Sequence, residues 1–179
     1  VSVKFVEDAK LNILSSITAI GTVNNPIVFY AADSELKWEG LHIAGSISSD
    51  LTYCEITDSN KGGLIISNSS NINITSCYIH HNESEEGGGI MINEGSQYIT
   101  IQSNQISYNS DYSGTGGRGL FCNNSSDINI CYNEIHHNSS SLYGGGIHLD
   151  TCNNCDISNN DVMSNSASAG GGIYVNIGF

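Results

Sequence analysis

The chain has 179 residues, which is the length of a single domain, and only 13% of them are charged. A formal net charge of -13 argues against binding to nucleic acid or to an anionic membrane surface, because both need clustered Lys and Arg. No run approaches about 18 consecutive apolar residues, so we expect no membrane insertion. An acidic surface rich in Asn and Ser suits a secreted or cell-surface protein.

The first 35 residues alternate apolar and polar side chains. Val1, Val3 and Phe5 predict a short β-strand, and the same alternation recurs further along this segment. We therefore expect residues 1–35 to form lead-in coils ahead of a regular repeat.

Residues 36–179 repeat a short phrase, in which a glycine is followed by two apolar residues with one other residue between them. Successive copies are 23, 26, 30, 27 and 26 residues apart, and a period in this range is typical of repeat architectures. The glycine of the phrase is Gly40, Gly63, Gly89, Gly119, Gly146 and Gly172.

Each period contains three short apolar segments separated by polar turns, for example residues 90–92, 98–101 and 105–108. Strands this short are not stable alone, so each must pair with the equivalent strand one coil away. The sequence therefore predicts a solenoid of short parallel strands.

Some residues recur at the same position of successive coils, which predicts ladders of stacked side chains in which each Asn hydrogen-bonds to its neighbours above and below. Cys54 and Cys77 share one such position, so their Cα atoms are expected ~5 Å apart, within disulfide range, and buried thiols are the alternative. The predicted ladders are Cys54, Cys77, Asn104, Asn133 and Asn160 in one column and Asn82, Asn109, Asn138 and Asn165 in another.

The pattern resembles the repeats of right-handed parallel β-helices, the pectate-lyase-like solenoids, over about residues 36–179. The resemblance implies an all-β solenoid of about seven coils with three short strands per coil, in one domain spanning residues 1–179. The run Ile-His-His-Asn at 79–82, followed by Gly-Gly-Ile at 88–90, also resembles repeats of polymorphic outer-membrane proteins and related bacterial surface adhesins. An Ile stands where that family usually has an aromatic residue. This second resemblance implies a role at the cell surface.

The end of the predicted solenoid has no recognisable closing helix or polar cap after the last repeat at 171–175. An uncovered coil presents unpaired strand edges that attract another chain. Three alternatives follow: the chain is a fragment of a longer one, its ends stack on neighbouring molecules, or the cap is of an unrecognised kind.

Four further cysteines lie in the second half of the chain. Cys122 and Cys155 align with apolar core residues, whereas Cys131 aligns with outward positions. The spacing Cys152-x-x-Cys155 occurs in metal and redox sites, but a single pair is weak evidence. Because Cys155 is assigned to the core, we expect no metal site here.

Two His-His pairs, His80-His81 and His136-His137, fill equivalent positions two coils apart, hence ~9.6 Å from each other. That separation is too long for both pairs to bind one metal ion directly. Neighbouring side chains in a strand face opposite ways, so a single pair is not expected to chelate a metal either. We interpret these residues as solvent-facing.

A polysaccharide lyase or glycoside hydrolase acting on an acidic polysaccharide is the alternative function that the β-helix resemblance implies. A lyase of this kind needs a basic residue and cations, often Ca²⁺ held by carboxylates. Arg118 lies beside a long turn with acidic residues near it, so Arg118 and Asp111 are the only catalytic candidates. We expect no cofactor, because solvated loop charge explains the acids of these turns better than calcium binding does. The candidates for calcium ligands, if calcium were bound, are Glu83, Glu85, Glu86 and Asp111.

The residue between the two apolar positions of each repeat should point outward. These residues form an apolar and aromatic stripe, and contiguous exposed apolar surface usually marks an interaction face. The alternatives are that long turns fold over the stripe or that its residues only favour β-structure. The predicted binding residues are Ile65, Met91, Phe121, His148 and Tyr174.

We therefore expect a non-catalytic secreted or cell-surface β-helix that acts in adhesion, in carbohydrate binding or as a structural, self-assembling surface component. Its expected partner is a polysaccharide, a cell-surface protein or a second copy bound through open solenoid ends. No nucleic-acid partner is expected.

Overall fold

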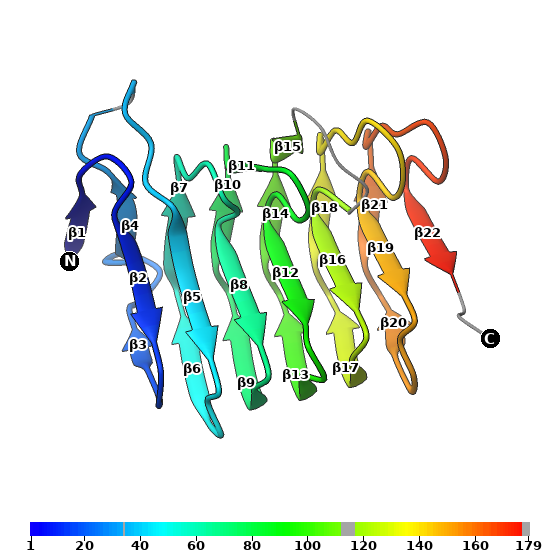
Figure 1. Ribbon diagram of the computed structural model, residues 1–179, viewed down its shortest axis with the longest axis horizontal. Helices are drawn as coiled ribbons and strands as arrows, with labels where there is room; N and C mark the ends of the chain where they lie inside the picture. Colours follow the sequence, from blue (N-terminus) through cyan, green and yellow to red (C-terminus); the bar gives the residue numbers. More distant parts are fainter. Residues whose placement is uncertain (34, 112–116, 177–179) are drawn as a thin grey trace.

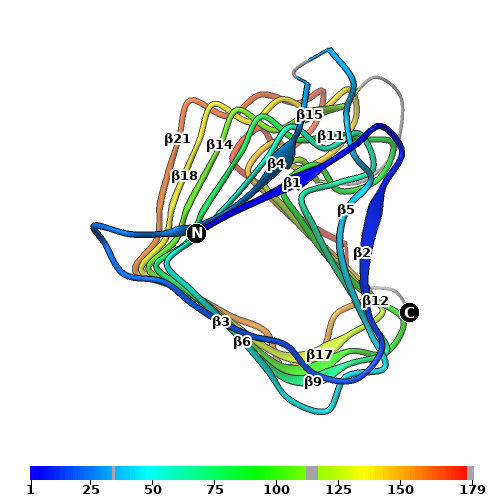
Figure 2. The ribbon, with the colours of Figure 1, turned by 90° about the vertical axis from the view of Figure 1, so that its left-hand side faces the viewer.

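The computed structural model describes residues 1–33, 35–111 and 117–176, and the regular structure in these residues consists of β-strands. Successive coils stack along one axis, with the N-terminus at one end of the stack and the last strand at the other (Figure 1). Seen along that axis, each coil is roughly triangular (Figure 2). In the described residues no helix is long and apolar enough to cross a membrane. The prediction for the end of the chain concerns in part residues 177–179, which lie outside the described residues.

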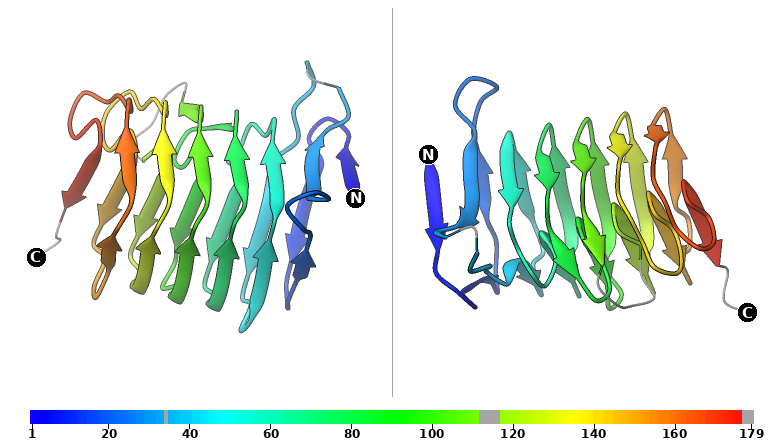
Figure 3. Two further views of the ribbon diagram at one scale, coloured as in Figure 1. Left: turned by 180° about the vertical axis from the view of Figure 1, so that it is seen from behind. Right: turned by 90° about the horizontal axis from the view of Figure 1, so that it is seen from above.

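Three parallel sheets run along the stack (Figure 3), one on each side of the triangle seen in Figure 2. The first sheet contains β1 (Ser2–Phe5), β4 (Ile27–Ala31), β7 (Cys54–Thr57), β10 (Tyr78–His80), β14 (Gln105–Ser107), β18 (Glu134–His136) and β21 (Asp161–Met163). The second contains β2 (Lys10–Ile13), β5 (Gly40–Ala44), β8 (Leu64–Ser67), β12 (Ile90–Asn93), β16 (Leu120–Asn123), β19 (Ile147–Asp150) and β22 (Ile173–Asn176). The third contains β3 (Thr18–Ile20), β6 (Ser49–Thr52), β9 (Ser70–Thr75), β13 (Gln97–Gln102), β17 (Ser126–Cys131) and β20 (Asp156–Ser158).

The predicted parallel β-helix with three short strands per coil is confirmed by this topology. A short additional pair, β11 (Glu83–Ser84) and β15 (Ser110–Asp111), lies in the long turns that follow the first sheet. The lead-in residues also form coils, since β1 pairs with β4, β2 with β5 and β3 with β6. Trp38 is fully buried beside these coils, where its ring stacks on Phe5 at 4.3 Å and its Nε1 donates to the Thr57 carbonyl oxygen at 2.7 Å.

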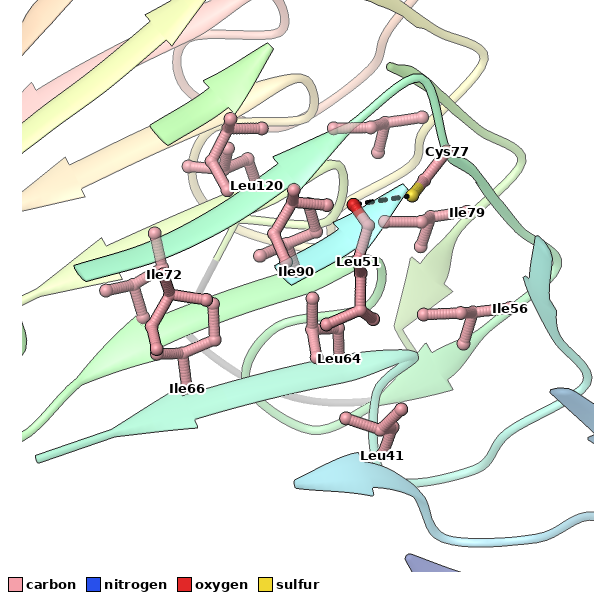
Figure 4. Packing of buried hydrophobic residues seen from close by; sticks show 14 of the residues in the cluster. Leu41, Leu51, Ile56, Leu64, Ile66, Ile72, Cys77, Ile79, Ile90 and Leu120 are labelled. Atoms are coloured by element: carbon pink, nitrogen blue, oxygen red, sulfur yellow. Dashed lines mark hydrogen bonds between the residues drawn. The ribbon is translucent and has the colours of Figure 1, made fainter. Parts of the chain in front are cut away.

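The interior of each coil is filled by aliphatic side chains from all three sheets (Figure 4). Parallel pairing places each of them against the equivalent residue of the next coil, as for Ile79 between Ile56 and Ile106. Full burial of one Ile side chain contributes about 1.5–3 kcal/mol, so the stacked columns are the main stabilising feature of the fold.

Both predicted Asn ladders are present at buried corners of the coils. Asn82 donates from Nδ2 to the Ile56 carbonyl oxygen at 3.0 Å, and its backbone N–H donates to Asn109 Oδ1 at 3.1 Å. Asn109 and Asn138 repeat this pattern, and Asn104 and Asn133 form the second ladder in the same way. These amides satisfy corner backbone groups that would otherwise be buried without partners.

Cys54 and Cys77 continue the second ladder toward the N-terminus, as predicted. The backbone N–H of Cys77 donates to Asn104 Oδ1 at 2.8 Å, and the backbone N–H of Cys54 lies 3.4 Å from Cys77 Sγ. Both are free, buried thiols in this structure, which corresponds to the second of the two alternatives for this pair.

Candidate functional site

The predicted stripe on the second sheet is in register from coil to coil. Ile65 pairs with Met91, Met91 with Phe121, Phe121 with His148, and His148 with Tyr174. The prediction that the stripe is exposed is wrong, because Met91, Phe121 and His148 are only 9%, 7% and 4% exposed.

Glycine-rich turns fold over the stripe and bury its centre. A Cβ atom added at Gly144 would lie 2.5 Å from the Cβ of His148, and one at Gly87 would lie 2.8 Å from the Cβ of Met91. Only glycine, which has no side chain, fits where these turns lie against the stripe. The alternative that turns fold over the stripe therefore holds for its central residues, which form a covered ladder.

A small cavity of about 150 Å³ remains at the C-terminal end of the stripe. It is lined in part by Phe121, Tyr174 and Tyr143, whose ring stacks on that of Tyr174 at 4.7 Å. This volume is below the usual range of about 300–1,000 Å³ for ligand sites.

The catalytic candidates Arg118 and Asp111 do lie together, but the guanidinium is fully buried. Arg118 donates from Nη2 to the Asp111 carboxylate and to the Glu85 carbonyl oxygen at 3.3 Å. Asp111 also accepts from the backbone N–H and the Oγ of Ser141, at 2.8 and 2.9 Å. Burial raises the pKa of Asp111, but these hydrogen bonds from Ser141 and Arg118 outweigh it and lower the pKa below its ordinary value. The pair cross-links neighbouring turns, and Arg118 has no access to a polymer in solvent.

The candidates for calcium ligands do not converge on one point. Asp111 is bound by Arg118, Glu83 forms an ion pair with Lys37 at 3.0 Å, and the side chains of Glu85 and Glu86 are exposed. None of these acids belongs to a cluster of three possible metal ligands in the described part of the chain.

The outer face of the first sheet is open and carries a row of polar and aromatic side chains. Parallel pairing places Glu55, Tyr78, Gln105 and Glu134 in consecutive register on β7, β10, β14 and β18. Two adjoining hollows of about 440 and about 300 Å³ run along this row and share Ser76 in their linings. Together they form one groove, which we define by its larger side chains Tyr53, Glu55, Tyr78, Gln105, Tyr132 and Glu134.

Two tyrosines stand at the corners where the third sheet turns into the first. Tyr53 and Tyr132 have backbone φ angles of 49° and 58°, in the left-handed region that makes the sharp bend. Their side chains are 37% and 60% exposed and border the groove. The corner geometry thus presents aromatic rings to solvent at fixed positions along the groove.

The His-His pairs lie beyond the other edge of this face, and the prediction that the two rings of a pair face opposite ways is wrong. His81 and His137 have φ angles of 53° and 55°, and this corner conformation brings each ring back to its partner. The Nδ1 atoms of His80 and His81 are 2.7 Å apart. Tyr108 stacks between His81 and His137, with ring centroids 5.2 and 5.0 Å away, so the column extends over three coils.

A family model described as a right-handed β-helix region matches residues 19–178. The chain belongs to the right-handed β-helix family. No curated protein and no solved structure is significantly similar to it. A β-helix domain is consistent with surface or carbohydrate-related proteins, and the finer resemblance to surface adhesins stays a prediction.

The cysteines of this β-helix are arranged differently from what the sequence predicted. Cys122 is buried in the core as expected, and Cys155 packs against the core but is only partly buried, whereas Cys131, expected at an outward position, is buried. The small side chain of Cys131 is flanked in the sheet by its ladder partners Gln102 and Ser158, one on each neighbouring coil.

Cys122 lies beside Cys152 and Cys155 on the next coil, and the three Sγ atoms are within 4.8 Å of one another. The Sγ atoms of Cys122 and Cys152 are 2.8 Å apart. A hydrogen bond with Cys122 is the main cause that lowers the pKa of Cys155 to about 7. The sequence showed the Cys152-x-x-Cys155 pair but not its third member.

Sequence reasoning also missed the groove, although the signal for it was present. Tyr53 and Tyr132 occupy the same corner position three coils apart, and His81, Tyr108 and His137 share another. Aligning the turns as carefully as the strands would have identified both aromatic columns.

Proposed function

We propose that this β-helix is a non-catalytic secreted or cell-surface protein that binds a neutral glycan in the groove on the first sheet. The observation that carries this proposal is the continuous open groove, bordered by exposed tyrosines and floored by a row of hydrogen-bonding side chains.

Aromatic and polar side chains in the groove match the two kinds of surface on a sugar. The rings of Tyr53 and Tyr132 offer flat apolar faces that pack against the C–H face of a pyranose, and their hydroxyls remain hydrogen-bonding groups. The side chains of Gln105, Glu55 and Glu134 offer acceptors for sugar hydroxyls, and the Gln105 amide also donates.

The spacing of the tyrosines requires a ligand of several sugar units. Tyr53 and Tyr132 are three coils apart, which corresponds to ~14 Å at ~4.8 Å per coil. A single monosaccharide cannot contact both rings, so the groove fits an oligosaccharide lying along the axis of the helix.

Charge favours a neutral ligand over a uronate. The groove lining contains the carboxylates of Glu55 and Glu134 and neither Lys nor Arg, in a chain of net charge -13. A uronate polymer would place like charges close together in this groove, which is unfavourable.

The fold supplies the site ready-formed. The floor of the groove lies on four consecutive strands, β7, β10, β14 and β18, and the buried amides of Asn104 and Asn133 fix corners beside it. A site held in its bound shape loses little conformational entropy on binding.

The test is isothermal titration of the intact chain with a panel of neutral and uronate oligosaccharides. We expect binding to a neutral oligosaccharide, and Tyr132→Ala is expected to weaken it about two- to tenfold, because one stacking interaction is worth about 0.5–1.5 kcal/mol. The matched control is Tyr98→Ala, because Tyr98 is 57% exposed but lies on the third sheet, outside the groove. Equal weakening by both substitutions, or binding of uronates alone, would refute the proposal.

A further inference from the structure

Cys122, Cys152 and Cys155 form a compact group at one corner of the β-helix, apart from the groove. Cys122 lies on β16, and the other two belong to the turn that follows β19 one coil further on. Cys122 is buried, whereas Cys152 and Cys155 are partly exposed, so the group reaches from the core to solvent.

The ladders show that all three cysteines replace residues of other kinds. Cys122 pairs with Leu149, and the equivalent residue of the preceding coil is Ile92. Asn129 pairs with Asp156, so the residues before them, Ile128 and Cys155, share one column, and Ile128 in turn pairs with Ile99.

Cys152 replaces a serine of a separate column. Ser126 forms a β-bridge with Asn153, so the residues before them, Ser125 and Cys152, occupy the same position on successive coils. Gln97 pairs with Ser126, so Ser96 occupies that position on the coil before Ser125. Cysteine therefore replaces other residue types in three different columns at the place where these two coils meet. Packing alone does not require cysteine at these three positions.

We propose that Cys122, Cys152 and Cys155 bind one thiophilic d¹⁰ cation, with Zn²⁺ as the probe. A Zn–S bond of about 2.3 Å places the sulfurs of a tetrahedral or trigonal site about 3.8–4.0 Å apart. The separations here range from 2.8 Å to no more than 4.8 Å, so small side-chain rotations bring the three sulfurs to these distances.

The half-exposed side leaves a fourth position for water or an external ligand. The other three cysteines do not take part. Cys131 belongs to no cluster of three possible ligands in the described residues, and Cys54 and Cys77 lie in a ladder on earlier coils. They serve as internal controls.

The experiment titrates Zn²⁺ into the whole chain, reduced and kept without oxygen, in competition with a chromophoric chelator, with Co²⁺ as a spectroscopic substitute. We expect one bound ion and a thiolate-to-cobalt charge-transfer band. Cys155→Ile and Cys152→Ser restore the residues of the neighbouring coils, so both variants should fold normally. Each should weaken Zn²⁺ binding by at least about 100-fold, since even a partner of a ligand contributes about 10- to 100-fold. Cys131→Ser should bind as the wild type does.

Three results would overturn the proposal. The first is the absence of stoichiometric Zn²⁺ binding to the reduced wild type. The second is unchanged binding in Cys155→Ile and Cys152→Ser, with circular dichroism showing that both are folded. The third is a Cys122–Cys152 disulfide that persists under reduction, detected by peptide mass mapping, because it would occupy two of the three thiolates.

Discussion

The outer faces of the first and second sheets share a backbone geometry and differ in what lies over them. On the second sheet, glycine backbone covers the column containing Phe121 and His148. On the first sheet, the row containing Tyr78 and Gln105 faces an open groove. Exposure in this solenoid is therefore decided by the turns, because the strands place outward side chains in the same way on both faces.

The cover over the second sheet can be broken at a single glycine. Gly144→Ala should lower the free energy of unfolding by about 4 kcal/mol, because the added Cβ clashes with His148 and the backbone conformation disfavours a side chain. Gly144 has φ +54°, and the added atom would lie 2.5 Å from the His148 Cβ.

The control for this substitution is Gly95→Ala, whose φ of +77° is similar but whose Cβ would meet nothing within 4 Å. It should cost only about 1 kcal/mol. Urea unfolding measures both, and equal losses would mean that close packing over the stripe is not the cause.

The two faces should respond differently to loss of an aromatic ring. Phe121→Ala should reduce the free energy of unfolding by about 3 kcal/mol, because a buried ring leaves a cavity. Tyr132→Ala should change it by less than about 0.5 kcal/mol, because the ring is on the surface. The two side chains are 7% and 60% exposed. Similar losses at the two positions would contradict the distinction between a covered and an open face.

The Asn ladder supports both faces and should show an intermediate effect. Asn109→Ala should cost about 2 kcal/mol, because it leaves buried donors and an acceptor of the adjoining coil without partners. Asn109 Oδ1 accepts from the backbone N–H and the Nδ2 of Asn82, and its own Nδ2 donates to the Ile79 carbonyl oxygen. Thermal unfolding indistinguishable from wild type would show that water replaces these hydrogen bonds.

The smallest expected effect is a pH dependence of the covered face. Burial is the main cause that lowers the pKa of His148 below its ordinary value. The folded state therefore disfavours the protonated His148 ring. The contribution of neutral His148 to the free energy of unfolding is fully present above about pH 6.5 and declines as the pH falls below that value.

His148→Phe should make the unfolding free energy less dependent on pH between about 7 and 5. The dependence should be reduced rather than removed, since burial also lowers the pKa values of His42 and His80. An identical slope in variant and wild type would contradict this assignment.

The fold was predictable because the sequence pattern that specifies one coil is repeated along the chain. Most coils carry the same Gly-apolar-x-apolar phrase, and Asn recurs at the same two corner positions from Asn82 and Asn104 onward, so the columns of Ile79 and Asn109 follow from alignment alone. Each copy supports the same register, and a shift by one residue would expose a whole column of aliphatic side chains.

The sites were less predictable because they depend on the irregular parts of the coils. The burial of Met91 and His148 follows from how variable turns fold back, which strand periodicity does not describe. The orientation of Tyr132 and His81 depends on left-handed corner conformations. The meeting of Cys122 with Cys155 requires two columns from different sheets to share one corner, which became clear only from the three-dimensional path.

The most direct test of glycan binding on the first sheet is hydroxyl-radical footprinting of the intact protein with and without a neutral oligosaccharide. Binding in the groove predicts protection of Tyr53, Tyr78 and Tyr132 when the sugar is present, with the labelling of Tyr98 unchanged. Phe121 should label slowly in both samples, because it is only 7% exposed. Protection confined to Tyr143 and Tyr174 would place the ligand on the second sheet and contradict the account.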